Sequence, residues 1–115
     1  MILYRIEDKH GRGPFRPGLS EQWRDASGHS FAPPWVEAGI TPAQFQGLFS
    51  SHAVKRGVAC RSRDQLYQWF SRAERRRLNR LGFREVEVKE PRILLETATQ
   101  VVFEIIPPFR AGGCR

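Results

Sequence analysis

Apolar and polar positions alternate along several short stretches of the chain, and a period of two is typical of β-strands. Residues 1–8 and 85–89 alternate in this way, and each is expected to form a strand with one more solvated face. Residues 57–61 are a further candidate strand. Residues 100–106, QVVFEII, have the strongest β-propensity in the chain and are expected to be central in a sheet. Residues 93–96 fit either a short strand or a helical turn.

Helical spacing and N-terminal caps predict three short helices. The first follows Thr41 and ends near residue 49, and the second and third follow Ser62 and Ser71, with a change of direction between them. Each cap has Gln or Glu three residues later, which is the pattern of a capping box: Gln44, Gln65 and Glu74. Gly82 is expected to close the last helix in a left-handed conformation, with Phe83 as the apolar contact after it.

The segment 9–34 is rich in Gly and Pro, which excludes a long regular element. A helical turn at residues 20–24, with Ser20 as its N-cap, is compatible with this composition. The aromatic residues in and beside the segment need partners, so we expect it to pack over the core as a cover: Phe15, Trp23, Phe31 and Trp35.

These elements predict an α+β fold, with a small and mostly antiparallel sheet of about four strands and two or three short helices on one face. The chain of 115 residues is long enough for one modest core. We therefore expect one domain over residues 1–115, with residues 109–115 as a flexible tail.

The net charge of +7 arises almost entirely from arginine, because Lys9, Lys55 and Lys89 are the only lysines. Arginine pairs bidentately with carboxylate and phosphate, although a GC-rich coding sequence would produce the same excess. Scattered histidines and cysteines predict no metal site. The apolar runs are too short to cross a membrane, so we expect a soluble cytoplasmic protein. Whether Cys60 pairs with Cys114 stays open, and so does the oligomeric state.

The arginines between residues 72 and 84 are the leading candidates for binding a partner: Arg72, Arg75, Arg76, Arg77, Arg80 and Arg84. Tyr67 and Trp69 adjoin them, and Arg, Trp and Tyr are the residue types that dominate interface hot spots. An acidic protein partner, nucleic acid and a merely solvated helix face are all compatible with the charge. Three aromatics within residues 67–70 cannot all face inward on one helix, so at least one is expected to be exposed or covered by the loop.

Other chemistry has weaker support in the sequence. His29 is a conceivable proton carrier, and Ser and Cys nucleophiles have no base in a recognisable pattern. Glu104, within the strongest predicted strand, is the one candidate catalytic carboxylate, although a strand glutamate that pairs with a neighbouring arginine would look the same.

Four motifs resemble a pattern of small proteins from phage and prophage genomes: LYRIED (residues 3–8), DQLYQWF (64–70), LGF (81–83) and QVVF (100–103). The order of elements is also distantly similar to ADP-ribosyltransferases. That similarity implies Arg5 at the cofactor end, Glu104 as the catalytic carboxylate and NAD as the cofactor. The chain departs from those enzymes, since Cys60-Arg61-Ser62 replaces their serine-rich strand and no ExE or QxE loop is present.

The leading hypothesis is a non-catalytic binding protein without a cofactor. It would act as a phage-encoded inhibitor that docks its arginine-rich, aromatic-edged helices on an acidic partner in a host nucleic-acid-handling or defence complex. The alternatives are an ADP-ribosyltransferase-like enzyme and non-specific nucleic-acid binding through the arginine face.

Overall fold

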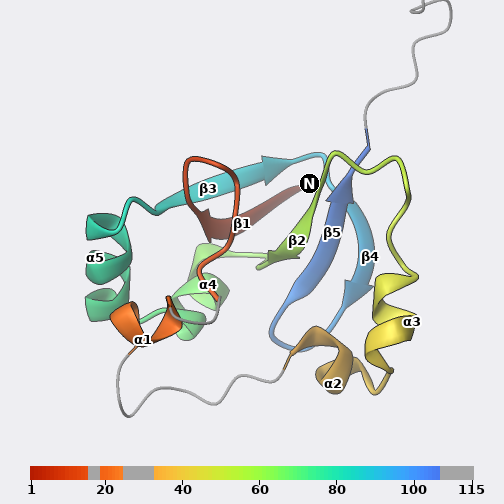
Figure 1. Ribbon diagram of the computed structural model, residues 1–115, viewed down its shortest axis with the longest axis horizontal. Coiled ribbons are helices and arrows are strands. Elements are labelled where there is room, and N and C mark those ends of the chain that lie inside the picture. The colour runs from red at the N-terminus through yellow and green to blue at the C-terminus, as the bar shows by residue number, and fades with distance from the viewer. Residues whose placement is uncertain (16–18, 25–32, 107–115) are drawn as a thin grey trace, which may run out of the picture.

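The computed structural model describes residues 1–15, 19–24 and 33–106, which form five strands and five helices (Figure 1). Strands β1 (Ile2–Glu7) and β3 (Arg84–Lys89) form a two-stranded antiparallel sheet. A second antiparallel sheet has the order β2-β5-β4 and consists of β2 (Lys55–Ala59), β5 (Val101–Ile105) and β4 (Arg92–Glu96). The predicted α+β class is confirmed, and the ambiguous residues 93–96 belong to a strand.

The two sheets meet at a single antiparallel bridge between Tyr4 and Cys60. Tyr4 N donates to Cys60 O at 2.8 Å, and Cys60 N donates to Tyr4 O at 2.7 Å. The prediction of one sheet with about four strands therefore differs from the structure, which has five strands in two sheets. Full-length pairing of β1 occurs only with β3, and its contact with β2 is limited to this bridge.

Strand β5 is central, as its sequence predicts. It pairs with β2 and β4 on its two edges, and Val102, Phe103 and Glu104 are fully buried. Strand β1 has one more solvated face, as predicted. Leu3 and Arg5 are buried on one face, and Ile2 is 39% exposed on the other face, where Ile6 is buried.

The helices lie at both ends of the molecule rather than on one face (Figure 1). Helices α1 (Ser20–Trp23), α4 (Arg63–Trp69) and α5 (Arg72–Arg80) gather at one end, and α2 (Pro34–Ala38) and α3 (Pro42–Gln46) lie beside the β2-β5-β4 sheet. The sequence analysis missed α2, although Pro34 at its first position and Gly39 with φ of 72° after its last are typical boundaries.

The predicted caps are largely confirmed. Thr41 and Ser71 form reciprocal capping boxes, and Ser62 accepts a hydrogen bond from Gln65 N at 3.1 Å. The Gln65 side chain binds Arg61 N instead of closing the box. Gly82 has φ of 95°, and the hydrogen bond from Phe83 N to Leu78 O completes a Schellman ending. The N-cap of α1 is Leu19, and Ser20 is its first helical residue.

The segment after β1 covers the helical end of the core, as expected. The Phe15 ring lies 5.1 Å from Trp23, 6.0 Å from Trp69 and 5.5 Å from Phe70. The indole of Trp23 donates to Pro14 O at 3.1 Å and is almost completely buried. Phe31 and the expected tail at 109–115 lie outside the described residues.

Candidate functional site

Helix α5 forms because its caps satisfy both ends and because it has one short apolar side. Glu74 belongs to the N-terminal capping box, and Leu78 packs into the core with Trp23, Leu66 and Phe83. The rest of the helix surface is dominated by arginine. The sequence therefore fixes which side of α5 is buried, and the arginines take the remaining positions.

Three of the six candidate arginines contact the protein itself. The Arg75 guanidinium lies 3.8 Å from the centre of the Tyr67 ring, and its Nε donates to Phe70 O at 3.3 Å. Arg77 Nη1 donates to Trp23 O at 2.9 Å, which ties α5 to the end of α1. Arg84 Nη1 donates to Asn79 O and Phe83 O at the C-terminal end of α5. These three side chains have structural contacts.

The other three arginines are exposed and form a row, defined here as the α5 arginine row: Arg72, Arg76 and Arg80. Their spacing of four residues places them on one ridge that extends about 12 Å along the helix axis. Within the part of the chain that the structure describes, none of the three takes part in an ion pair. The row therefore presents three solvated guanidinium groups.

The two candidate aromatic residues differ in position. Tyr67 is half-buried beside Arg75, and its hydroxyl donates to Glu85 Oε2 at 2.8 Å. Trp69 is only 8% exposed, and its indole donates to Thr99 O at 2.7 Å. Tyr67 is therefore at the edge of the arginine surface, whereas Trp69 faces the interior.

Acidic side chains border this surface without contacting the α5 arginine row. Glu85 and Glu87 pair with Arg63 from α4, at 2.8 Å and 3.3 Å. The Arg63 guanidinium also lies 4.7 Å from the centre of the Tyr4 ring. The surface near α5 is consequently mixed in charge along one edge.

Arg5 and Glu104, the candidate catalytic pair, are both buried but do not converge. The Arg5 guanidinium lies 5.5 Å from the centre of the Phe103 ring. Glu104 follows Phe103 and so faces the opposite side of the β2-β5-β4 sheet, because successive strand side chains alternate. There its Oε1 accepts from Ser50 N at 2.7 Å and its Oε2 lies 3.6 Å from exposed Arg92.

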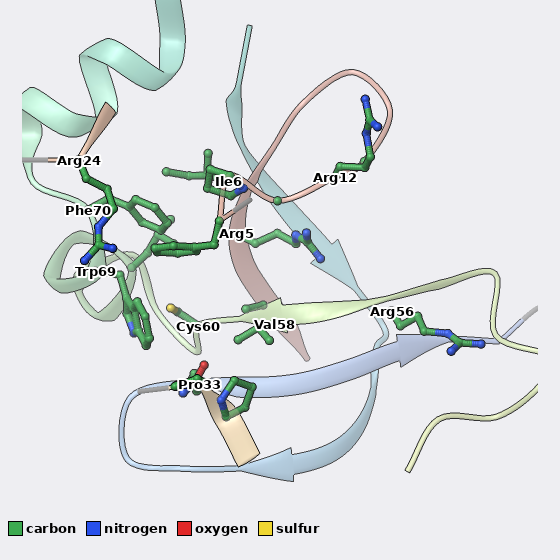
Figure 2. Close-up of a pocket in the computed structure, with 18 of the residues that line it drawn as sticks. Arg5, Ile6, Arg12, Arg24, Pro33, Arg56, Val58, Cys60, Trp69 and Phe70 are labelled. Carbon is green, nitrogen blue, oxygen red and sulfur yellow. The ribbon is translucent and has the colours of Figure 1, made fainter. Parts of the chain in front are cut away.

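Arg5 lines a cavity of about 670 Å³ between the segment after β1, strand β2, and helices α2 and α4. Figure 2 shows Arg5 between Trp69 and Phe70 on one side of the view and Arg56 on the other. The described lining residues include four arginines and no Asp or Glu: Arg5, Arg12, Arg24 and Arg56. Phe15, Trp35, Trp69 and Phe70 supply aromatic surface to the same cavity.

Two glycines make room for the Arg5 side chain. A Cβ atom at Gly57 would lie 2.0 Å from Arg5 Nη1, and one at Gly13 would lie 3.3 Å from Arg5 Nη2. Sequence reasoning missed this arrangement because the two glycines are far apart in the chain. The Gly-Arg-Gly-Pro-Phe run at residues 11–15 was the available signal, and the sequence analysis used it only as a loop marker.

The remaining candidates supply no assembled site. Cys60 is 4% exposed, and burial raises the pKa of its thiol to about 12. His29 and Cys114 lie outside the described residues. Among the residues that the structure describes, no cluster of His, Cys, Asp and Glu is suited to hold a metal ion. No helix in these same ranges has the length and apolar character needed to cross a membrane.

No curated protein and no solved structure matches the chain. A family model described as the bacteriophage T4 Y00F protein matches residues 1–106. This match spans nearly the whole chain and supports a small phage-encoded protein, in agreement with the resemblance seen in the sequence motifs. The chain belongs to the bacteriophage T4 Y00F protein family.

Proposed function

We propose that this phage protein acts without catalysis, by docking the α5 arginine row on an acidic surface of a host protein. The observation that carries the proposal is the exposure of Arg72, Arg76 and Arg80, none of which has an ion-pair partner among the described residues. Guanidinium groups bind carboxylates bidentately, so three of them on one ridge complement a row of Asp or Glu side chains.

The surroundings of the row add the apolar area that a protein interface needs. Leu81 is 40% exposed at the C-terminal end of α5, and Tyr67 is held beside the row by Arg75. An interface of this kind has aromatic and arginine contacts at its centre and charges at its rim. Trp69 is no part of this proposal, because it is buried.

A protein partner fits better than nucleic acid, because acidic groups lie beside Arg63 and Tyr67, and Tyr67 contacts Arg75 of α5. Glu85 and Glu87 have side chains that are 27% and 39% exposed. A nucleic-acid backbone that approached α5 would meet these carboxylates, whereas a protein can place its own cations opposite them. The partner class that we propose is a host nucleic-acid-handling or defence complex, inhibited when its acidic surface is covered.

The test compares charge reversal on the row with the same reversal elsewhere. Arg76→Glu with Arg80→Glu should weaken binding to a fluorescent polyglutamate peptide by about 10-fold or more, because attraction becomes repulsion. Lys9→Glu with Lys89→Glu makes the same change in net charge at exposed positions outside α5 and should leave affinity nearly unchanged. Fluorescence anisotropy at several salt concentrations measures both.

Two results would overturn the proposal. Equal loss in both double variants would mean that only net charge matters. Tighter binding to a DNA duplex than to polyglutamate, with a steep loss of affinity as salt rises, would assign the row to nucleic acid. With these same variants as baits in a host lysate, the proposed partner is retained by the wild type and the lysine variant and lost from the arginine variant.

An NAD-using enzyme with Arg5 and Glu104 has less support, because the two side chains lie on opposite faces of the β2-β5-β4 sheet. Its test is the Glu104→Ala variant with a thermal shift in NAD. Loss of NAD hydrolysis or transfer by a variant with wild-type stability would favour the enzyme over the docking protein.

A further inference from the structure

The buried guanidinium of Arg5 lacks the hydrogen bonds that a buried cation normally makes. Its side chain is only 7% exposed. Its Nε lies 3.2 Å from Glu7 Oε2 without hydrogen-bond geometry, and neither Nε nor Nη1 has a hydrogen-bond partner. Burying a charged group without such partners is costly, so this group calls for an explanation.

Glu7 does not neutralise Arg5 on its own. The Glu7 carboxylate also pairs with Lys55 Nζ, which lies 2.8 Å from each of its oxygens. Two cations therefore share one anion, and the group of three keeps a net positive charge. Burial lowers the pKa of Arg5, and the nearby Glu7 carboxylate opposes that effect. An additional anion would relieve the imbalance.

The cavity around Arg5 is suited to receive that anion. Arg12 and Arg56 are exposed at its margin, and no acidic residue is found among its described lining. Arg12 is 59% exposed and has a loose pair with Asp8 at 3.5 Å. The Arg56 guanidinium is turned to the Glu104 face of β2, where it lies 5.3 Å from the Phe49 ring centre and donates to Ser50 O. Arg5 and Arg12 therefore supply the positive charge that favours a phosphate.

The rest of the lining is aromatic, so the ligand should carry a flat ring as well. Trp69 and Phe70 lie at one side of the cavity in Figure 2, and Phe15 packs against both. Aromatic side chains stack on nucleobases, and a volume of about 670 Å³ is in the usual range of small-molecule sites.

We propose that this cavity binds a nucleotide, with its phosphate at Arg5 and its base against Phe15, whose side chain lines the cavity and is 47% exposed. Arg5 would supply the positive charge, and Gly13 and Gly57 leave room for its guanidinium. This site is separate from the α5 arginine row, so it adds a small-molecule function to the proposed docking function.

The experiment titrates the full-length protein with adenosine monophosphate, uridine monophosphate, adenosine and inorganic phosphate. Tryptophan fluorescence and isothermal titration calorimetry measure binding, because Trp35 and Trp69 line the cavity. At least one nucleotide should bind more tightly than either adenosine or phosphate alone. Equal affinity for phosphate and for the nucleotides, or no binding of any probe, would overturn the proposal.

Arg5→Met tests the assigned anion-binding group. Methionine fills much of the same space without a charge, and Glu7 keeps Lys55 as its partner, so the substitution leaves no buried charge unpaired. The variant should fold and bind the nucleotide about 30-fold more weakly, since a buried charged hydrogen-bonding partner is lost. Lys89→Met removes one exposed positive charge outside the cavity and should bind as the wild type does.

A second variant covers the case in which Arg5→Met fails to fold. Arg12→Gln removes an exposed cation at the cavity margin and should weaken binding about 3-fold, with a smaller salt dependence. Unchanged affinity and salt dependence in Arg12→Gln, or unchanged affinity in a folded Arg5→Met, would contradict the proposed site.

Discussion

Arg5 and the α5 arginine row place the same side chain in two opposite environments. Arg72, Arg76 and Arg80 are exposed, and water satisfies their charges. Arg5 is 6% exposed, shares one carboxylate with Lys55 and has two nitrogen atoms without hydrogen bonds. An exposed cation adds little to the stability of the fold, whereas a buried one determines what can lie around it. We therefore propose different roles for the two, a docking surface for the α5 arginine row and a ligand cavity around Arg5.

The largest expected effect is on the reactivity of the Cys60 thiol. Cys60 lines the cavity, so its reactivity reports how apolar the cavity is. Burial raises its pKa to about 12 from an ordinary 9.0, even though arginines line the same cavity. At neutral pH the thiolate is then about 1000-fold rarer than in an unperturbed cysteine. In a Cys114→Ser background, iodoacetamide should modify Cys60 only at the rate of unfolding, and rapid labelling at neutral pH would mean that water reaches this thiol.

The next prediction concerns Glu104, which is buried on the opposite face of the β2-β5-β4 sheet. It asks whether this side chain stabilises the fold. Glu104→Ala should lower the free energy of unfolding by about 3 kcal/mol, because Ser50 N and Arg92 lose their partner. Urea denaturation measures this change. The exposed Glu96, which pairs with Arg61, provides the control, and Glu96→Ala should change stability little. Wild-type stability of Glu104→Ala would return this residue to the catalytic candidates.

Gly57 tests how tightly Arg5 is confined. Gly57→Ala should lower the free energy of unfolding by about 2 kcal/mol, because the new Cβ would lie 2.0 Å from Arg5 Nη1 and the guanidinium also packs near Gly13. In a double-mutant cycle, adding Arg5→Met to Gly57→Ala should restore about 1 kcal/mol or more of the lost free energy of unfolding. If the effects of the two substitutions on stability are simply additive, Arg5 has room to move away.

The smallest expected effect is on the contribution of the α5 arginine row to stability. In the triple variant, Arg72, Arg76 and Arg80 are changed to Ala. Its free energy of unfolding should lie within about 0.5 kcal/mol of the wild-type value, because the three side chains are solvated. Chemical denaturation checks this at low and at moderate salt. A loss above that size would assign the row a structural role and would weaken the docking proposal.

Local signals in the sequence predicted the helical half of the molecule well. Caps at Thr41, Ser62 and Ser71 and the glycine ending at Gly82 depend on contacts between near neighbours in the chain, so their residue types suffice. The central position of β5 followed from its continuous apolar run. The sequence did not separate the α5 arginine row from the other candidate arginines, because the contacts of Arg75, Arg77 and Arg84 arise from the fold.

The environment of Arg5 could not be predicted in the same way. Alternation in β1 predicted one more solvated face but did not show that Arg5 would be buried with Leu3. The burial of Arg5 depends on the absence of side chains at Gly13 and Gly57, which only the tertiary fold brings to Arg5. The separation of Arg5 from Glu104 likewise depends on the sheet register rather than on any local pattern.

The central claim, that Arg5 is a buried ligand-binding cation unlike the exposed α5 arginine row, is tested most directly by NMR of the arginine Nε–Hε groups. The Arg5 signal is assigned by its disappearance in the Arg5→Met variant. The signals of the α5 arginine row are assigned by their disappearance in the triple alanine variant. We predict slow hydrogen exchange and a shift on addition of adenosine or uridine monophosphate for Arg5 and for no arginine of the row. Exchange at Arg5 as rapid as in the row, or nucleotide shifts at Arg76 and Arg80 instead, would contradict the claim.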